Sequence, residues 1–165
     1  QNIIINISKK KIDKLKMKDL QNKKLSSDKV ATVASIIAKD RKIRKLVHVF
    51  QLKCAYNPPK KYNGSCLDGR DIGSVVVKDA DVKFYITANV KVRASRRYKE
   101  LKAKNKKITY KEVLKSIKKR DKSDKNRKIS PLKKTKDMVL LNCSSESISS
   151  CFMKIKKIID RKINN

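Results

Sequence analysis

The sequence predicts an α/β fold with a helical excursion before the last strand of its sheet. Three observations predict it. From residue 64 onward the candidate elements follow the order strand, strand, helix, helix, strand, helix. Met138–Asn142 forms a continuous apolar run, as expected for a strand buried on both faces. Thr109 and Glu112 form a T-x-x-E capping box, which marks a helix start between the strands.

The first part of the chain supplies helices. Ile3-Ile4-Ile5 is a short strand candidate, and the lysine-rich stretch 9–24 has apolar residues too irregularly spaced for a prediction. Helices are predicted from about Ser27 to Ala38 and from about Arg41 to Tyr56, and Asn57-Pro58-Pro59 ends the second. Their apolar stripes are Val30, Val33, Ala34 and Ile37, then Ile43, Leu46, Val47 and Phe50.

The second part supplies the sheet. Gly64–Leu67 is predicted to be a short buried strand, and Val82–Thr87 a second strand. Asn89 can cap a helix that runs to about Ala103. Ser130-Pro131 is expected to stop the capping-box helix, and a last helix is predicted over about 147–163. The apolar stripe of the capping-box helix consists of Tyr110, Val113, Leu114 and Ile117. The last helix is expected to bury Ile148, Phe152, Ile155, Ile159 and Ile163.

Composition bounds the class of protein. The 165 residues suggest one domain, and the net charge of +31 would suit a polyanionic partner. Only nine of the 46 basic residues are arginines, and the lysines are scattered over nearly every polar face, so the charge indicates nonspecific nucleic-acid affinity rather than the function. No apolar run approaches eighteen residues, so no membrane partner is expected.

The four cysteines lie at positions 54, 66, 143 and 151, with no C-x-x-C and no spacing typical of metal ligands. Because each lies among apolar residues, all four are predicted to be reduced core side chains, with the cytoplasm as the default compartment. His48 has no second histidine, so no metal site is expected.

Two charged clusters carry the functional signal. Leu67-Asp68-Gly69-Arg70-Asp71-Ile72-Gly73 places a carboxylate beside a guanidinium in a turn, which suits an anionic, hydrogen-bonding ligand; alone, it fits a surface ion pair better. If the helical spacing of three and four residues continues beyond Ile117, it places Arg120, Asp124 and Arg127 on the inward-facing side of the capping-box helix. Such burial is costly unless the charges are paired or face a polar cleft, and Asp124 can orient Arg120.

A third set, Arg93, Arg96 and Arg97, falls on one face of the helix that Asn89 begins. A solvated cationic face is an equally good interpretation of these three residues on their own.

Taken together, these segments resemble bacterial cytidylate kinase (CMP kinase), a nucleoside monophosphate kinase. The resemblance covers nearly the whole chain from about Ser26. It implies a three-layer P-loop nucleoside monophosphate kinase fold with a parallel sheet, an inserted monophosphate-binding lobe and a helical lid. The segments that carry it are residues 67–73, Asp79–Ala88, Arg93–Leu101, Lys119–Arg127 and Ser130-Pro131-Leu132.

The resemblance also implies domains and partners. Residues 1–165 would form a single incomplete kinase domain: 1–55 the remainder of the monophosphate lobe and connecting helices, 64–88 and 138–165 the core, and 89–132 the lid region. The implied substrates are CMP, dCMP and ATP with Mg²⁺, and a cytoplasmic monomer is expected.

Residue roles follow from the same resemblance. Ser35, Arg44 and Asp71 match positions that read the cytosine edge. Arg70 and Arg127 match those that clamp the CMP phosphate, and Arg120 and Asp124 those that hold the ribose. Arg93, Arg96 and Arg97 fall where the lid approaches ATP, and the residues implied in catalysis are Arg97, Arg120 and Arg127.

One departure is large. The family binds ATP on a G-x-x-x-x-G-K-[ST] loop, and the only glycines in this sequence are Gly64, Gly69 and Gly73. The chain also begins on Gln. We therefore expect an N-terminally truncated cytidylate kinase with almost no turnover of its own. The Tyr56–Tyr62 stretch looks like an insertion of unknown role. The alternatives are a basic nucleic-acid- or ribosome-associated protein and a kinase of the same fold that uses UMP.

Overall fold

The computed structural model describes residues 28–37, 40–104 and 107–164, together with Lys14, Asp19 and Leu25. The chain divides into two compact units, which are considered separately. The first comprises residues 1–77 and 127–131, and the second residues 78–126 and 132–165. The predicted strand at Ile3–Ile5 and almost all of the lysine-rich stretch 9–24 lie outside the described residues.

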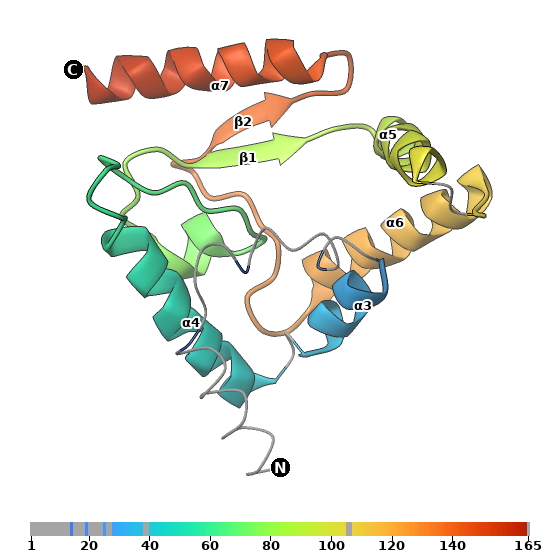
Figure 1. The fold of residues 1–165 in the computed structure, drawn as a ribbon, viewed down its shortest axis with the longest axis horizontal. Helices are drawn as coiled ribbons and strands as arrows, with labels where there is room; N and C mark the ends of the chain where they lie inside the picture. The colour runs from blue at the N-terminus through green and yellow to red at the C-terminus, as the bar shows by residue number, and fades with distance from the viewer. Residues whose placement is uncertain are drawn as a thin grey trace. The chain divides into compact units, whose positions relative to one another are not determined.

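The described part of the first unit contains two α-helices and one π-helical turn (Figure 1). Helices α3 (Asp28–Ile37) and α4 (Arg41–Tyr56) confirm both helix predictions. Asp40 caps α4, because its Oδ1 accepts hydrogen bonds from the amides of Lys42 at 2.8 Å and Ile43 at 3.0 Å. The third element, η2, spans Ile72–Val76.

The strand predicted at Gly64–Leu67 is wrong. Residues 64–66 are exposed and irregular, and the Ser65 hydroxyl donates a 2.6 Å hydrogen bond to the Cys54 carbonyl. Residues 72–76 beyond it coil into η2, in which the amides of Val75 and Val76 donate to the Asp71 carbonyl at 2.8 and 3.2 Å. The amides of Val75 and Val76 thus have an acceptor within the same turn and need no neighbouring strand.

The second unit contains a parallel pair of strands, which confirms the α/β class with a parallel sheet. Strand β1 (Phe84–Thr87) pairs with β2 (Val139–Asn142), and Phe84 lies opposite Val139. The expectation that β2 is buried on both faces is wrong: Val139 is 36% and Leu140 54% exposed. In the described part of the chain this sheet has two strands, so β2 has no neighbour on its other side.

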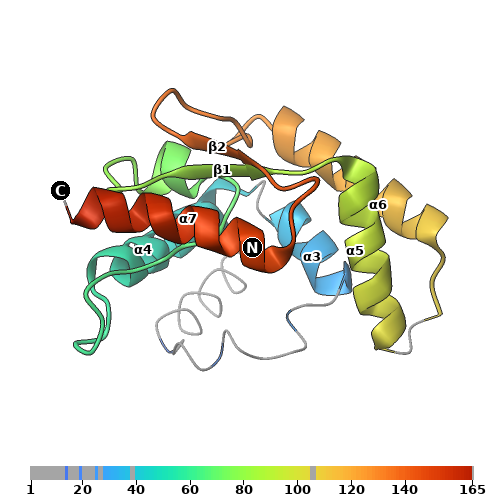
Figure 2. The same ribbon diagram turned by 90° about the horizontal axis from the view of Figure 1, so that it is seen from above.

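Helices α5 (Val90–Ala103) and α6 (Tyr110–Asn126) lie against each other (Figure 2) and enclose a small apolar core. Both predicted caps are confirmed. Asn89 Oδ1 accepts from the Lys91 amide at 2.9 Å, and the Glu112 carboxylate accepts from the Thr109 amide at 2.7 Å. The core consists of buried Ala94, Leu101 and Val113, with Tyr98, Ile108, Leu114 and Ile117 packed around them.

Helix α7 (Ile148–Ile163) begins after its cap Ser147 and runs back alongside the two strands (Figures 1 and 2). Its predicted burial is only partly right. Ile155 and Ile159 are half-buried. Three other members of the stripe are mostly exposed, namely Ile148 at 86%, Phe152 at 60% and Ile163 at 70%. The apolar stripe is thus wider than the surface of the described residues against which it packs. No helix within the described ranges is long and apolar enough to cross a bilayer.

The prediction that all four cysteines are reduced core residues is also wrong. Cys143, just after β2, and Cys151, in the first turn of α7, form a disulfide, because the short connection between these elements brings their Cα atoms to 6.3 Å. Cys54 and Cys66 are free, and Cys66 is exposed.

Removing core volume between α5 and α6 should be costly. Leu101 is 1% exposed, so Leu101→Ala is expected to lower the free energy of unfolding by about 2–4 kcal/mol. Leu140→Ala, at a 54% exposed leucine, is the matched control and should cost under about 1 kcal/mol. Urea denaturation followed by circular dichroism measures both, and equal losses would contradict the assignment of the core.

An ion pair between Lys83 and Asp137 links the starts of the two strands, and we expect it to make the stability of the protein depend on pH in the acid range. Hydrogen bonds from Lys83 and Thr135 lower the pKa of Asp137 from 3.8 to about 2. A lowered folded-state pKa contributes stability above the unfolded value, and this is lost as the pH falls from about 4 through about 2. The melting temperature of Asp137→Asn should therefore lie below that of the wild type at pH 5–7, and the gap should close toward pH 2. Asp81→Asn, at an exposed aspartate, should show no such closing gap.

Candidate functional site

In the first unit, one carboxylate lies between two guanidiniums. Arg44 Nη2 forms an ion pair with Asp71 Oδ2, and Arg127 Nη2 lies 3.8 Å from Asp71 Oδ1. The side chains of Asp71 and Arg127 are 10% and 9% exposed, and that of Arg44 is 21% exposed. Charges removed from water to this degree need a partner of opposite sign, and Asp71 serves both arginines.

Local backbone structure holds each of these three residues. The amide of Arg44 donates to the Asp40 carbonyl at 3.0 Å, which fixes Arg44 in the first turn of α4. The carbonyl of Asp71 closes η2, so its side chain leaves the chain just before that turn. Arg127 Nε donates to the Ser130 carbonyl at 2.6 Å, within a bend where Ser130 has a φ of 50°.

The turn before Asp71 needs a glycine for reasons of space. A Cβ atom on Gly69 would lie 2.7 Å from Cγ1 of Ile72, a distance that no real Cβ contact tolerates. Arg70 follows Gly69 and is half-buried. Ser35 belongs to α3, but its side chain is outside the described residues.

The remaining predicted residues belong to the second unit. Asp124 on α6 is buried, as predicted, and its carboxylate lies 3.9 Å from Arg120 Nε. The inward placement of Arg120 is wrong, since its side chain is 49% exposed. Helix α6 ends at Asn126, before the predicted stop at Ser130-Pro131, and the Leu132 amide returns to donate to the Asp124 carbonyl at 2.8 Å.

Each of the three arginines of α5 has a hydrogen-bond acceptor, although Arg96 is exposed. Arg93 donates to both carboxylate oxygens of Asp121, at 2.9 and 2.6 Å, and its Nε donates to the Ala88 carbonyl at 2.9 Å. The hydrogen bond to Asp121 raises the pKa of Arg93. Arg96 Nη2 donates to the carbonyls of Cys143 and Glu146 at 2.8 and 2.7 Å.

Arg97 has a local partner. Its Nη1 donates to Glu100 at 2.7 Å, and Lys104 donates to the same carboxylate at 2.7 Å. Hydrogen bonds from Lys104 and Arg97 lower the pKa of Glu100. Arg97 and its partner Glu100 lie on the same helix, where charged neighbours three residues apart meet.

Sequence reasoning missed Asp121. The step of three from Ile117 to Arg120 was followed, whereas a step of four reaches Asp121, whose partner Arg93 lies 28 residues away on another helix. The signal available in the sequence was its position inside the charged cluster 119–127, next to Arg120.

A separate groove of about 650 Å³ lies in the second unit, at the starts of β1 and β2. Asp79, Lys83 and Asp137 are among its lining residues, and none of the predicted site residues is. In parallel sheets, ligands bind beyond the carboxyl ends of the strands, so this groove is at the opposite end from the expected one.

Neutralising Asp71 should destabilise the first unit. Asp71→Asn keeps the shape of the side chain but leaves two buried guanidiniums without their shared anion, so the free energy of unfolding should fall by about 1–3 kcal/mol. Asp68→Asn, three residues away and exposed, should cost under about 0.5 kcal/mol. Chemical denaturation of both variants is the measurement, and equal stability of the two would refute the shared ion pair.

Comparison with known proteins gives relatives over most of the chain. The chain is 52% identical over 105 residues to a cytidylate kinase of Clostridium botulinum (strain Okra), a match that covers 64% of this chain and 48% of that protein. It is 50% identical over 97 residues to a cytidylate kinase of Clostridium tetani, covering 59% and 43%. It is 40% identical over 147 residues to a cytidylate kinase of Bartonella bacilliformis, covering 89% and 66%.

The chain thus spans about half the length of the first of these relatives. The family model described as cytidylate kinase matches residues 2–161, which is nearly the whole of the 165-residue sequence. This match includes the turn at Asp71, the α5 arginines and the charged end of α6. The chain belongs to the cytidylate kinase family.

Proposed function

We propose that the protein of which these 165 residues form part transfers the γ-phosphate of ATP, bound with Mg²⁺, to CMP or dCMP. The observation that carries the proposal is the buried cluster of Arg44, Asp71 and Arg127, which places two cations and one anion around a single turn. Family membership supplies the reaction class. The products are ADP and CDP or dCDP.

The cluster suits cytosine in particular. The exocyclic amine of the base can donate to the carboxylate of Asp71, while Arg44 can donate to the ring nitrogen and the carbonyl. The ion pair between these two side chains fixes the direction of both. Uracil carries a carbonyl where cytosine has its amine, and that carbonyl would face the Asp71 carboxylate without a donor. Ser35 is assigned to the same edge of the base.

The remaining residues are assigned to the phosphate and ribose of CMP and to the phosphates of ATP. Arg70 and Arg127 hold the CMP phosphate, and Asp124, buried beside Arg120, holds the ribose hydroxyls. An oxygen of the CMP phosphate attacks the γ-phosphorus, and the bond from that phosphorus to the bridging oxygen of ATP breaks. Positioning and charge neutralisation dominate this reaction, which suits an arginine-rich lid. Arg97, Arg120 and Arg127 are assigned to the transferred phosphoryl group, and Arg93, Arg96 and Arg97 to the ATP side.

The architecture we propose is the three-layer nucleoside monophosphate kinase fold, with 1–55 in the monophosphate lobe and 89–132 in the lid region. The 165 residues contain no G-x-x-x-x-G-K-[ST] sequence. Backbone amides around the β-phosphate are needed to bind ATP productively. We therefore expect this stretch alone to bind the acceptor nucleotide and to turn over very little.

Calorimetry with CMP, dCMP, UMP and AMP tests the acceptor side. CMP or dCMP should bind best, and Asp71→Ala should weaken that binding roughly tenfold or more, because a paired polar group is lost from the base edge. Asp68→Ala is the matched control and should bind as the wild type does.

A nucleic-acid-binding protein would behave differently. With a net charge of +31, it would bind RNA with an affinity that falls steeply with salt and responds in small steps to many lysine substitutions. Equal binding of all four nucleotides together with such salt dependence would overturn the kinase proposal. A coupled assay on a version preceded by a P-loop segment from a relative then tests turnover on CMP.

A further inference from the structure

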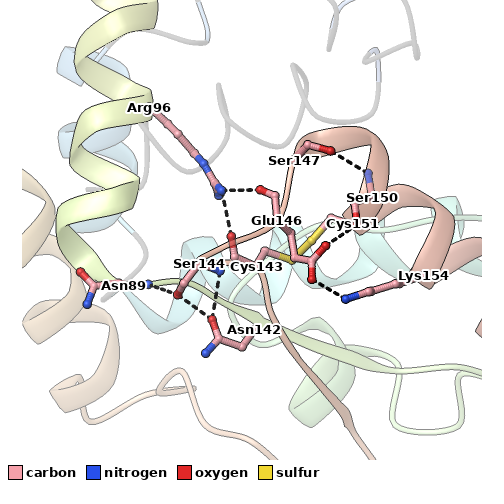
Figure 3. Close-up of a disulfide and its surroundings, with 10 residues drawn as sticks. All are labelled: Asn89, Arg96, Asn142, Cys143, Ser144, Glu146, Ser147, Ser150, Cys151 and Lys154. Atoms are coloured by element: carbon pink, nitrogen blue, oxygen red, sulfur yellow. Dashed lines mark hydrogen bonds and ion pairs between the residues drawn. A yellow bond between two sulfur atoms is a disulfide. The ribbon is translucent and has the colours of Figure 1, made fainter.

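The disulfide between Cys143 and Cys151 closes the connection from β2 to α7 (Figure 3). The two residues are eight positions apart, one just beyond the strand and the other in the first turn of the helix. Cys143 is 7% exposed, whereas Cys151 is half-buried. A small thiol in solution therefore reaches the sulfur of Cys151 more readily than that of Cys143.

The connection that the disulfide closes is held to the rest of the second unit by polar contacts. Arg96 Nη2 donates to the carbonyls of Cys143 and Glu146, so one guanidinium nitrogen bridges both ends of the turn (Figure 3). The amide of Asn89, the cap of α5, donates to the Ser144 hydroxyl at 2.8 Å. The Cys143 amide donates to the Thr87 carbonyl at 2.7 Å.

We propose that Cys143 and Cys151 form a reversible redox site that locks residues 143–147 and, through them, the orientation of Arg96. The site takes low-molecular-weight thiols and disulfides as its reactants. The consequence for nucleotide binding rests on the proposed function, because only there is Arg96 assigned to the ATP side. The structural lock itself does not depend on that assignment.

The exchange balances without any further reactant. A thiolate attacks the Cys151 sulfur, the disulfide bond breaks, and Cys143 leaves as a thiolate that takes up a proton. A second thiol then attacks the mixed disulfide and releases Cys151. Overall, the protein disulfide gains two electrons and two protons, and two small thiols become one small disulfide. The reverse reaction, with a small disulfide as oxidant, closes the lock.

The other two cysteines favour a reversible site over a permanent cross-link. Cys54 and Cys66 remain free, and Cys66 is exposed. Small domains that depend on disulfides for their stability pair their cysteines into a framework, and Cys54 and Cys66 do not extend the Cys143–Cys151 pair into one.

Reduction should act on the two carbonyls that hold Arg96. Two unbonded sulfurs need more room than a bonded pair, and reduction removes the covalent constraint between the end of β2 and the first turn of α7. Both hydrogen bonds from Arg96 end in this segment, at Cys143 and Glu146, and each depends on its present short geometry. The guanidinium is then free to turn toward other acceptors.

Thiol counting tests the pairing. After denaturation without a reductant, N-ethylmaleimide should label two cysteines per chain, identified by peptide mapping as Cys54 and Cys66. After reduction it should label all four. Labelling of four cysteines without reduction, or of a different pair, would overturn the proposal.

Hydrogen exchange measured by mass spectrometry tests the lock on the 165-residue chain. Adding a reducing agent should speed amide exchange in 143–147 by roughly tenfold and lower the melting temperature by roughly 5 °C, while the core around Val113 stays unchanged. The Cys54→Ser/Cys66→Ser variant should respond as the wild type does, and the Cys143→Ser/Cys151→Ser variant should not respond. Equal exchange in 143–147 before and after reduction would sink the inference.

Arg96→Ala separates the part played by the guanidinium. In the oxidised protein it should speed exchange in 143–147, and reduction should then add less than it does in the wild type. Full additivity of the two changes would show that the disulfide and Arg96 are not coupled. No nucleotide enters any of these measurements, so their failure would leave the kinase proposal untouched, and a failed CMP titration would leave the redox site untouched.

Discussion

The first unit depends on the carboxylate of Asp71, which allows Arg44 and Arg127 to lie close together with little exposure to water. Two guanidiniums in a poorly hydrated place repel each other, and without a shared anion their burial would cost more than packing could return. An ionised carboxylate has about four acceptor positions, and two arginines occupy only part of them. Under the proposed function, the same group would hold Arg44 in place and accept from the base, so stability and recognition would draw on one side chain.

The sequence predicts those parts of the fold whose signals are local. The caps at Asn89 and in the T-x-x-E box, and the proline stop after Tyr56, lie within a few residues of the boundaries they set, and the structure confirms all of them. Burial was harder to predict, because it depends on what lies opposite. β2 and the stripe of α7 are apolar, yet Leu140 and Ile148 are exposed among the described residues. An apolar pattern shows which face is able to be buried but does not show what covers it.

The candidate site shows the same division. Buried Asp124 was predictable, because it lies on the same helix face as Ile117. Helical stepping failed for Arg120, whose long side chain can reach water from a position near the inward row. The partners of Arg93 and Arg96 could not be found from spacing within one helix, since Asp121 lies on α6 and Glu146 in the connection from β2 to α7. Cys143 and Cys151 were misjudged for a related reason: their apolar neighbours indicate burial but say nothing about whether two sulfurs meet.

The connection between β1 and β2 constrains the order in which the second unit can assemble. Phe84 pairs with Val139, so the sheet closes only after more than fifty intervening residues have been brought together. Closing so long a loop costs chain entropy that the strand pairing recovers only at the end. The α5–α6 core joins residues much closer in sequence and shortens the effective loop when it forms first. If the helical core forms first, it therefore lowers the entropic cost of pairing β1 with β2.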